Sequence, residues 1–164
     1  MKNIIVIYTS FFYTGFFPKA SGTIATAAFL PFYYFIFAGM PLWMYFLLTA
    51  AITAAGIWAS NYAVEIFKAE DPSKVVIDEV SGFLVTMMFI PFTPERMAIG
   101  FFLSRFYDIV KFPPARQAEK LHGGTGIMLD DVIAGVYANL TLWALIFLRL
   151  DAAAAELFRH VFFS

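Results

Sequence analysis

Long apolar stretches with few charges dominate this sequence and restrict most strongly the folds open to it. The stretch from Leu42 to about Ser60 reads LWMYFLLTAAITAAGIWAS, and we expect it to continue as helix towards Lys68. A straight helix needs roughly 20 such apolar residues to cross a bilayer. Of all residues, 61% are hydrophobic and 14% charged, whereas soluble domains average roughly 45–50% apolar and about 25% charged residues. A core of this size cannot bury 21 Phe, 8 Tyr and 3 Trp. We therefore expect lipid to cover much of the surface of an integral membrane protein.

Four further apolar stretches accompany this one. They run from Ile24 to Ala38, Val75 to Ile90, Met97 to Val110 and Ile127 to Leu148. Ala, Leu, Met and Phe dominate them without sustained alternation, which favours helices over strands. Because several stretches are too short for a straight span, we expect an all-α fold, a compact multi-helix membrane bundle with several short or interfacial helices. No repeat or linker divides the sequence, so 1–164 is expected to form a single domain.

Several classes of protein are excluded by charge and composition. The net charge of -1 gives no basic field for a nucleic acid. The absence of cysteine excludes disulfides, thiolate metal sites and a cysteine nucleophile. The N-terminal stretch MKNIIVIYTSFFYTGFFPKASGT has bulky aromatic residues where a signal peptide would have a small-residue cleavage site. We expect it to be retained, and either spanning the bilayer or lying in its interface.

The distribution of lysine and arginine predicts how the chain crosses the membrane. The uncharged turn Gly39-Met40-Pro41 and the segment from Pro91 to Arg96 are placed outside. Six basic residues then collect on the cytosolic side (Lys19, Lys68, Lys74, Lys111, Arg116 and Lys120), against Arg96 and Arg149 on the other side. The same threading brings four polar stretches, KASGT, IDEVSG, SRFYDIVK and HGGTGIMLDD, to the cytosolic face.

Five carboxylates and two cations lie within these polar stretches, namely Asp78, Glu79, Asp108, Asp130 and Asp131 with Arg105 and Lys111. A charged residue costs about 2.5–3.5 kcal/mol at the centre of a membrane helix, so seven scattered charges would exceed the roughly 5–15 kcal/mol net stability of a domain. The charges must therefore be gathered, partly hydrated and paired. Five anions less two cations leave about three negative charges, which predicts a divalent cation, and oxygen ligands favour Mg²⁺ over zinc.

A phosphate group best fits Mg²⁺ together with Arg105 and Lys111, and such a site suits phosphoryl transfer. The predicted metal ligands are Asp78, Glu79, Asp130 and Asp131. Adjacent acids on a helix point about 100° apart, so we expect one of each pair to ligate and the other to orient a neighbour or a water. The predicted catalytic residues are Arg105, Asp108, Lys111, His122 and Asp131, and the predicted phosphate-binding residues are Arg105, Lys111, Thr23, Gly123 and Gly124.

Each of these residues also has a structural interpretation. The acid pairs suit helix N-termini, Arg105, Asp108 and Lys111 suit an intrahelical ion-pair ladder, and the glycines with His122 suit a turn. Two other functions compete with an enzyme: a small transporter or channel with an acidic cation site, and a non-catalytic scaffold. The clustering of the acids at one end disfavours the transporter, and a scaffold has no reason to keep five acids together with an arginine and a lysine.

The order of the motifs SGT, DEVSG, RFYDIVK and HGGTGIMLDD, between roughly Thr14 and Leu145, resembles the phosphatidylglycerophosphatase A family. The resemblance implies an all-helical, Mg²⁺-dependent enzyme of the bacterial inner membrane with its site facing the cytosol. Its substrate would be a phospholipid, phosphatidylglycerol phosphate, hydrolysed to phosphatidylglycerol and inorganic phosphate. Two positions depart from the family, which usually has proline where Ser21 and Phe112 stand. Attack by water and attack by a carboxylate nucleophile both stay open, and the sequence predicts no oligomeric state.

Overall fold

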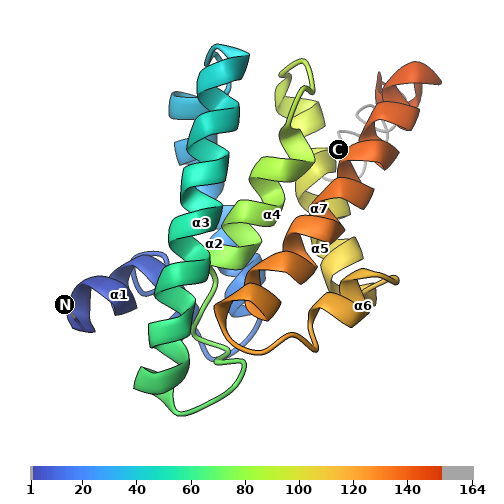
Figure 1. Ribbon diagram of the computed structural model, residues 1–164. Helices are drawn as coiled ribbons and strands as arrows, with labels where there is room; N and C mark the ends of the chain where they lie inside the picture. The colour runs from blue at the N-terminus through green and yellow to red at the C-terminus, as the bar shows by residue number, and fades with distance from the viewer. Residues whose placement is uncertain (1, 153–164) are drawn as a thin grey trace.

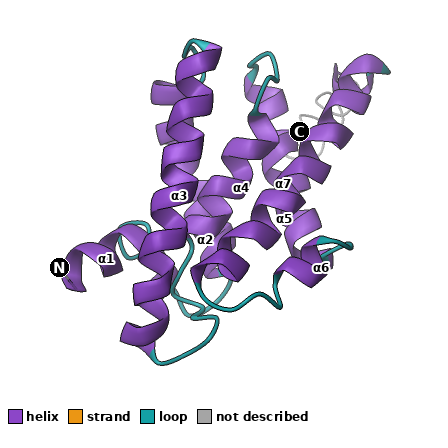
Figure 2. Ribbon diagram, viewed as in Figure 1, coloured by secondary structure: helices purple, strands orange, loops and turns teal. Residues whose placement is uncertain are grey.

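The computed structural model describes residues 2–152, which form helices joined by loops, with no strand among them (Figure 1, Figure 2). The helices are α1 (Lys2–Thr9), α2 (Ser21–Phe32), α3 (Leu42–Phe67), α4 (Ile77–Met87), α5 (Pro94–Val110), α6 (Ala115–Ala118) and α7 (Gly124–Phe147). A short 3₁₀ turn, Thr14–Phe16, precedes α2, and a π-helical turn, Tyr33–Phe37, follows it. The expected all-α class is confirmed for this part of the chain.

The longest helix, α3, follows the apolar stretch that begins at Leu42 and continues beyond it. Its 26 residues give a rod of roughly 39 Å. The helix ends where Lys68 takes a left-handed conformation (φ 54°) and its N–H bonds to the carbonyl of Val64. The predicted helix from Leu42 towards Lys68 is therefore confirmed. Of the described helices, α3 and α7 are long and apolar enough to cross a membrane.

A proline changes the geometry of α2. Pro31 lies inside this helix, where its ring removes one backbone donor and crowds the preceding turn. The chain relaxes directly afterwards into the π-helical turn, in which the N–H of Ala38 bonds to the carbonyl of Tyr33 at 3.0 Å. The wider turn keeps Tyr33 and Phe37 buried, in contact with Tyr45 of α3. The predicted apolar stretch from Ile24 to Ala38 is thus helical in two forms.

The short helix α4 is the centre of the bundle and packs against α2, α3, α5 and α7. Its side chains Val80, Phe83, Leu84 and Met87 are almost fully buried. Two glycines allow its backbone to approach α7 closely. A Cβ on Gly82 would lie 2.7 Å from the carbonyl oxygen of Asp131, and a Cβ on Gly135 would overlap the carbonyl oxygen of Gly82. Small residues at this crossing therefore bring the acidic ends of α4 and α7 together.

The polar loops meet at one end of the bundle (Figure 1). The chain before α2, the loop 68–76 and the loop 111–123 lie at the lower end of the view, whereas Gly39–Pro41 and the loop 88–93 lie at the upper end. This is the arrangement that the threading from lysine and arginine predicts. The first helix, α1, crosses α3 instead of running parallel to it, and its eight residues reach only about 12 Å. A helix of this length is shorter than a straight span requires, which favours the alternative in which the N-terminal stretch lies in the interface.

The substitution Gly135→Ala tests the close contact between α4 and α7. The added methyl group would overlap the backbone of Gly82, so we expect a loss of about 1–3 kcal/mol, as overpacking usually causes. Thermal unfolding in detergent, followed by circular dichroism, measures the effect. Gly39→Ala is the matched control, because no described atom lies within 4 Å of a Cβ at that position. Equal melting temperatures for the two variants would contradict the proposed role of the contact.

Candidate active site

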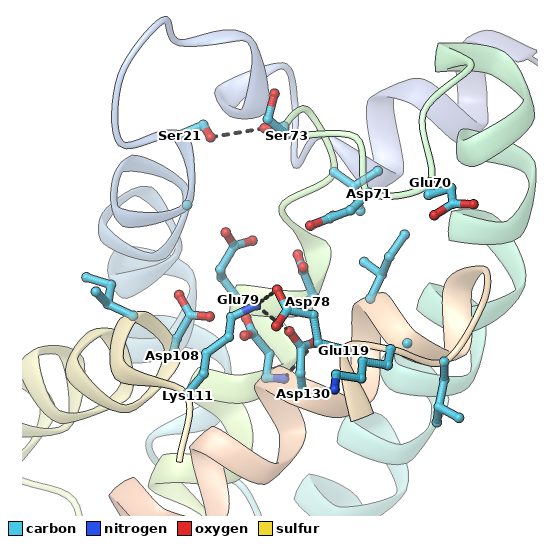
Figure 3. A pocket seen from close by; sticks show the side chains of 18 of the residues that line it. Ser21, Glu70, Asp71, Ser73, Asp78, Glu79, Asp108, Lys111, Glu119 and Asp130 are labelled. Atoms are coloured by element: carbon cyan, nitrogen blue, oxygen red, sulfur yellow. Dashed lines mark hydrogen bonds and ion pairs between the residues drawn. The ribbon is translucent and has the colours of Figure 1, made fainter. Parts of the chain in front are cut away.

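The polar loops enclose a cavity of about 570 Å³. Its walls come from the start of α2, the loop 68–76, the first turn of α4, the end of α5, the loop 111–123 and the start of α7. Figure 3 shows charged groups from α4, α5, α7 and the loop that follows α5 directed towards a common centre, namely Asp78, Glu79, Asp108, Lys111 and Asp130. Of the residues predicted from the sequence, the cavity is lined by Thr23, Asp78, Glu79, Arg105, Asp108, Lys111, His122, Gly123, Asp130 and Asp131. Gly124 is the one that does not line it.

Three carboxylates form the acidic centre of the cavity. Asp78 and Glu79 lie in the first turn of α4, and Asp131 lies in the second turn of α7. One oxygen from each lies within 4.8 Å of the others. Both members of the first acid pair therefore face the same centre, whereas the expectation that one acid of each pair ligates a metal stays a prediction. The glutamate side chain is longer by one methylene group, so it can reach the centre from a different direction on the helix.

These acids lack the partners that buried carboxylates need. Among the described residues, no hydrogen-bond partner reaches Oδ1 of Asp78 or Oε2 of Glu79. Burial, and then the charges of Glu79 and the two aspartates of α7, raise the pKa of Asp78 well above its usual range. A cation bound between the acids would lower it again, because an opposite charge favours the ionised form. Unpartnered oxygens in such a group are what a hard divalent cation requires.

Arg105 and Asp108 form a pair on one side of the acidic centre. Nη2 of Arg105 donates to Oδ2 of Asp108 at 2.6 Å, across one turn of α5. Nε of Arg105 is buried and has no partner among the described residues. Asp108 also lies next to Asp131. The guanidinium group is thus held from one edge and keeps a donor for another ligand.

Lys111 lies on the other side of the centre and joins two acids. Its Nζ donates to Oδ2 of Asp130 at 2.8 Å and to Oε1 of Glu119 at 2.9 Å (Figure 3). Burial lowers the pKa of Lys111, but the hydrogen bonds and charges of Asp130 and Glu119 outweigh it and raise the pKa above its ordinary value. Since an ammonium group has three donors, one is left for a ligand. Asp130 is therefore a partner of Lys111 and not a member of the group of three acids.

The start of α2 covers the acidic centre. A Cβ on Gly22 would overlap the carboxylate of Glu79 and would lie 3.0 Å from Nη2 of Arg105. The glycine of the SGT motif is thus required because Glu79 and Arg105 occupy the space of a side chain. Ser21 donates through Oγ to the carbonyl of Ser73 at 3.1 Å, and so ties α2 to the loop 68–76. A proline at this position could not make that bond.

The glycines of the HGGTG motif mainly serve packing. The N–H of Gly124 donates to Oδ1 of Asn61 on α3 at 2.8 Å, and a Cβ at Gly124 would overlap the carbonyl of Ile57. The predicted phosphate contact of Gly124 is therefore not supported, because its amide already has a protein partner. Gly123 has a positive φ of 72°, which glycine adopts without strain. His122 is exposed on the rim of the cavity.

Sequence analysis missed several residues that the fold brings to the cavity. Glu119 follows α6, which packs on α7 through the buried Ala115 and Ala118. The position of α6 brings Glu119 back to Lys111, and no local sequence pattern predicts this contact. Glu70 and Asp71 line the opposite wall. Asn61, the first strongly polar residue after the apolar stretch of α3, does not line the cavity but holds the start of α7 through its bond to Gly124.

An all-helical chain in which a cavity sets carboxylates beside an arginine and a lysine fits the class of helical phosphatases. A family model described as Phosphatidylglycerophosphatase A matches residues 7–146. The chain therefore belongs to the phosphatidylglycerophosphatase A family and is a phosphatase, a hydrolase of phosphoric monoesters. The resemblance seen in the motifs is confirmed.

Individual relatives agree with the family. The chain is 36% identical over 138 residues to a protein of Bacteroides thetaiotaomicron named putative phosphatidylinositol-3-phosphatase, covering 80% of this chain and 86% of that protein. It is 32% identical to phosphatidylglycerophosphatase A of Escherichia coli, covering 76% of this chain and 73% of that protein. It is also 32% identical to the protein of the same name from Haemophilus influenzae, covering 62% and 64%. No solved structure is significantly similar to the chain.

The substitution Gly22→Ala tests whether the start of α2 is fitted to the acidic centre. Because the methyl group would displace the carboxylate of Glu79, we expect phosphatase activity to fall by about tenfold or more, as small displacements of catalytic groups do. Phosphate release measures the effect. Ala27→Ser, on an exposed position of the same helix, is the control and should keep its activity. Full activity of Gly22→Ala would show that the centre tolerates a side chain there.

Proposed function

We propose that this chain is a Mg²⁺-dependent phosphatase of phosphatidylglycerol phosphate in the bacterial inner membrane, with its site on the cytosolic side. The observation that carries the proposal is the group of Asp78, Glu79 and Asp131, whose oxygens lie within 4.8 Å of one another beside Arg105 and Lys111. The residues 1–164 are proposed to act as one domain. Family membership supports the reaction, and the geometry supports the assignment of residues to it.

The three acids fit a divalent cation. Two of them have oxygens without any described partner, and the ligand set consists of oxygen alone, which suits Mg²⁺. Asp78, Glu79 and Asp131 would hold the ion. When bound, it supplies positive charge that polarises the phosphoryl group. Without such charge, a doubly ionised phosphate would be repelled by the acids that line the cavity.

Arg105 and Lys111 are proposed to bind the phosphate from two sides. Arg105 keeps its orientation through the bond to Asp108 and has the unpartnered Nε for a phosphate oxygen. Lys111 is held by Asp130 and Glu119 and has one donor left. Fixed donors of this kind stabilise charge on the phosphoryl oxygens because they need no reorganisation during the reaction. Thr23 and Gly123 line the cavity and complete the proposed phosphate site.

Hydrolysis breaks the bond between phosphorus and the glycerol oxygen of the lipid. In the overall reaction an oxygen from water takes the place of the lipid oxygen on phosphorus, one proton equivalent ends on the leaving oxygen and one stays with the phosphate. Phosphatidylglycerol and inorganic phosphate result. Asp108 lies between Arg105 and Asp131, where it can accept a proton from the water. His122 on the rim is placed to donate a proton to the leaving oxygen.

A second lipid substrate is favoured by one relative. The Bacteroides thetaiotaomicron protein, named for phosphatidylinositol 3-phosphate, shares more identity with this chain than the Escherichia coli protein does. Both lipids present a phosphomonoester on a polyol headgroup. A cavity of about 570 Å³ has room for such a headgroup beyond the phosphate. Phosphatidylinositol 3-phosphate is therefore the second candidate substrate.

The location in a membrane rests on the surface of the bundle. Within residues 2–152, two helices are long and apolar enough to span. Large apolar side chains of α3 are exposed, among them Trp43, Phe46, Leu47 and Trp58. Since contiguous apolar surface of this size is not stable in water, a bilayer is the proposed surrounding. The acids gather at one end of the bundle. A path for cations would need them spread through the membrane depth, so the transporter alternative is not retained.

Metal removal tests the proposed cation. Purified protein should release phosphate from phosphatidylglycerol phosphate with Mg²⁺ and lose this activity in chelator. Asp78→Asn and Asp131→Asn should lower kcat by about 100-fold or more, because each removes a proposed ligand of the cation that stabilises negative charge in the transition state. Phosphatidylinositol 3-phosphate assayed in parallel identifies the preferred lipid.

The control for this assay is Glu65→Gln, on an exposed position of α3 outside the cavity, which should keep full activity. Activity that persists in chelator, or in both aspartate variants, would remove the cation from the mechanism.

Arg105→Lys tests the guanidinium group. Lysine keeps the positive charge but loses the rigid set of donors that holds Asp108 and phosphate together. We expect kcat/KM to fall by about 100-fold, as for the loss of one fixed donor, with an unchanged melting temperature. Steady-state kinetics with the lipid substrate measure the change. A variant with wild-type kcat/KM would mean that charge alone is sufficient at this position.

A further inference from the structure

We infer that the N-terminal aromatic segment, Lys2–Phe17, is an interfacial anchor that lies at the boundary between headgroups and acyl chains of the cytosolic leaflet. In this position it holds one wall of the cavity at the depth of the lipid phosphates. The inference rests on the membrane location and function proposed above.

The segment exposes large apolar side chains but is too short to span. Ile4 is 72% exposed, Phe12 65%, Tyr13 51% and Phe17 55%. The helical part, α1, has eight residues and reaches about 12 Å, less than half of a bilayer core of roughly 30 Å. Apolar and aromatic side chains on a short helix that crosses its neighbours are typical of an element lying in the membrane interface.

The turn after α1 directs its aromatic rings outward. Phe11, Phe12 and Tyr13 all have positive φ, of 40°, 54° and 68°, a conformation that costs bulky residues free energy. Hydrogen bonds hold it, from the N–H of Phe12 to the carbonyl of Ile7 and from the N–H of Tyr13 to Oγ of Ser10. Phe11 packs inward on Phe29, whereas its two successors are exposed. Contact of the two exposed rings with lipid would offset the free-energy cost of this strained turn.

Contacts with α3 give the depth of the segment. Tyr8 donates to the carbonyl of Ile52 at 2.9 Å, and the ring of Phe16 contacts that of Phe67. The apolar stretch of α3 ends at Ser60, which is eight residues after Ile52 and seven before Phe67. These separations correspond to roughly 12 Å and roughly 10 Å along the helix. Tyr8 therefore meets α3 within its apolar stretch, and Phe16 meets it beyond Ser60, so the part of the segment between them, with Phe12 and Tyr13, lies near the end of that stretch.

The same segment is joined to the cavity wall. The N–H of Val76 donates to the carbonyl of Thr9 at 2.8 Å, and Gly15 packs so closely on the backbone of Lys74 that a Cβ would overlap its carbonyl. The ammonium group of Lys74 lies 5.0 Å from the ring centre of Phe16. Ser73 and Val75, the neighbours of Lys74, line the cavity. The depth of the segment in the membrane thus sets the depth of this wall.

Positive charge accompanies the aromatic rings at this level. Lys19, just before α2, and Lys68, just after α3, are exposed, and Lys74 lies between the rings of Phe16 and Phe67. Lysines beside aromatic residues are attracted to the phosphates of anionic lipids. The exposed aromatic side chains of this segment adjoin the exposed apolar surface of α3. A docking site for a soluble protein does not require such continuity, whereas a lipid leaflet would cover both surfaces together.

The absence of cysteine from the chain makes single-site labelling straightforward. Nitroxide labels on Phe12→Cys and Phe17→Cys, in bilayer discs of phosphatidylethanolamine and phosphatidylglycerol, report depth through their relative accessibility to oxygen and to a water-soluble nickel complex. Ala51→Cys, exposed in the middle of the apolar stretch of α3, and Glu65→Cys, exposed beyond its end, are the references. We expect both labels to lie between the two references.

Labels as accessible to nickel as the one at Glu65, or as protected as the one at Ala51, would overturn the inference. Phe17→Cys gives the answer independently of the strained turn, since the φ of Phe17 is -63°. The depth measurement needs no catalysis, so it stands or fails separately from the phosphatase assay. A chain with the expected depths but no activity on either lipid would refute the proposed function alone.

Discussion

The structure depends on the cost of holding ionised groups in an apolar chain. Asp78, Glu79 and Asp131 are drawn to one centre, where they repel one another unless positive charge is present. Arg105 and Lys111 supply part of that charge from either side, and each is held by an acid outside the group of three. The carboxylate oxygens without a partner would bind a cation, and the unpartnered Nε of Arg105 would bind a phosphate. In the proposed function, substrate chemistry and fold stability therefore involve the same charges.

Close backbone contacts make this gathering possible. Gly82 and Gly135 let α4 lie against α7, so that acids from two helices reach the same centre. Gly22 lets the start of α2 close over Glu79 and Arg105. Each glycine occupies a place where another backbone or a charged group leaves no room for a side chain. The motifs of the family thus combine chemistry with the packing that positions it.

Much of the fold and of the cavity could be predicted from the sequence. The boundaries of α3, the helical class and the meeting of the four polar stretches follow from apolar length and from the positions of lysine and arginine. The π-helical turn after Pro31 and the crosswise α1 were not predicted, because they depend on how the chain packs on neighbouring elements. Glu119 and Asn61 were missed for the same reason, since their contacts with Lys111 and Gly124 join distant parts of the chain.

The sequence by itself determined that the described part of this chain is helical, that its composition is unusually apolar, and that its charges collect at one end. These properties follow from composition and periodicity, which act along the chain. Only the tertiary structure decided which acids share a centre and which ones pair with cations. Asp130 and Asp131 are neighbours in sequence, but the turn of the helix between them sends one to Lys111 and the other to the acids of α4. That division depends on side-chain direction and on the helices that pack nearby, which no local pattern contains.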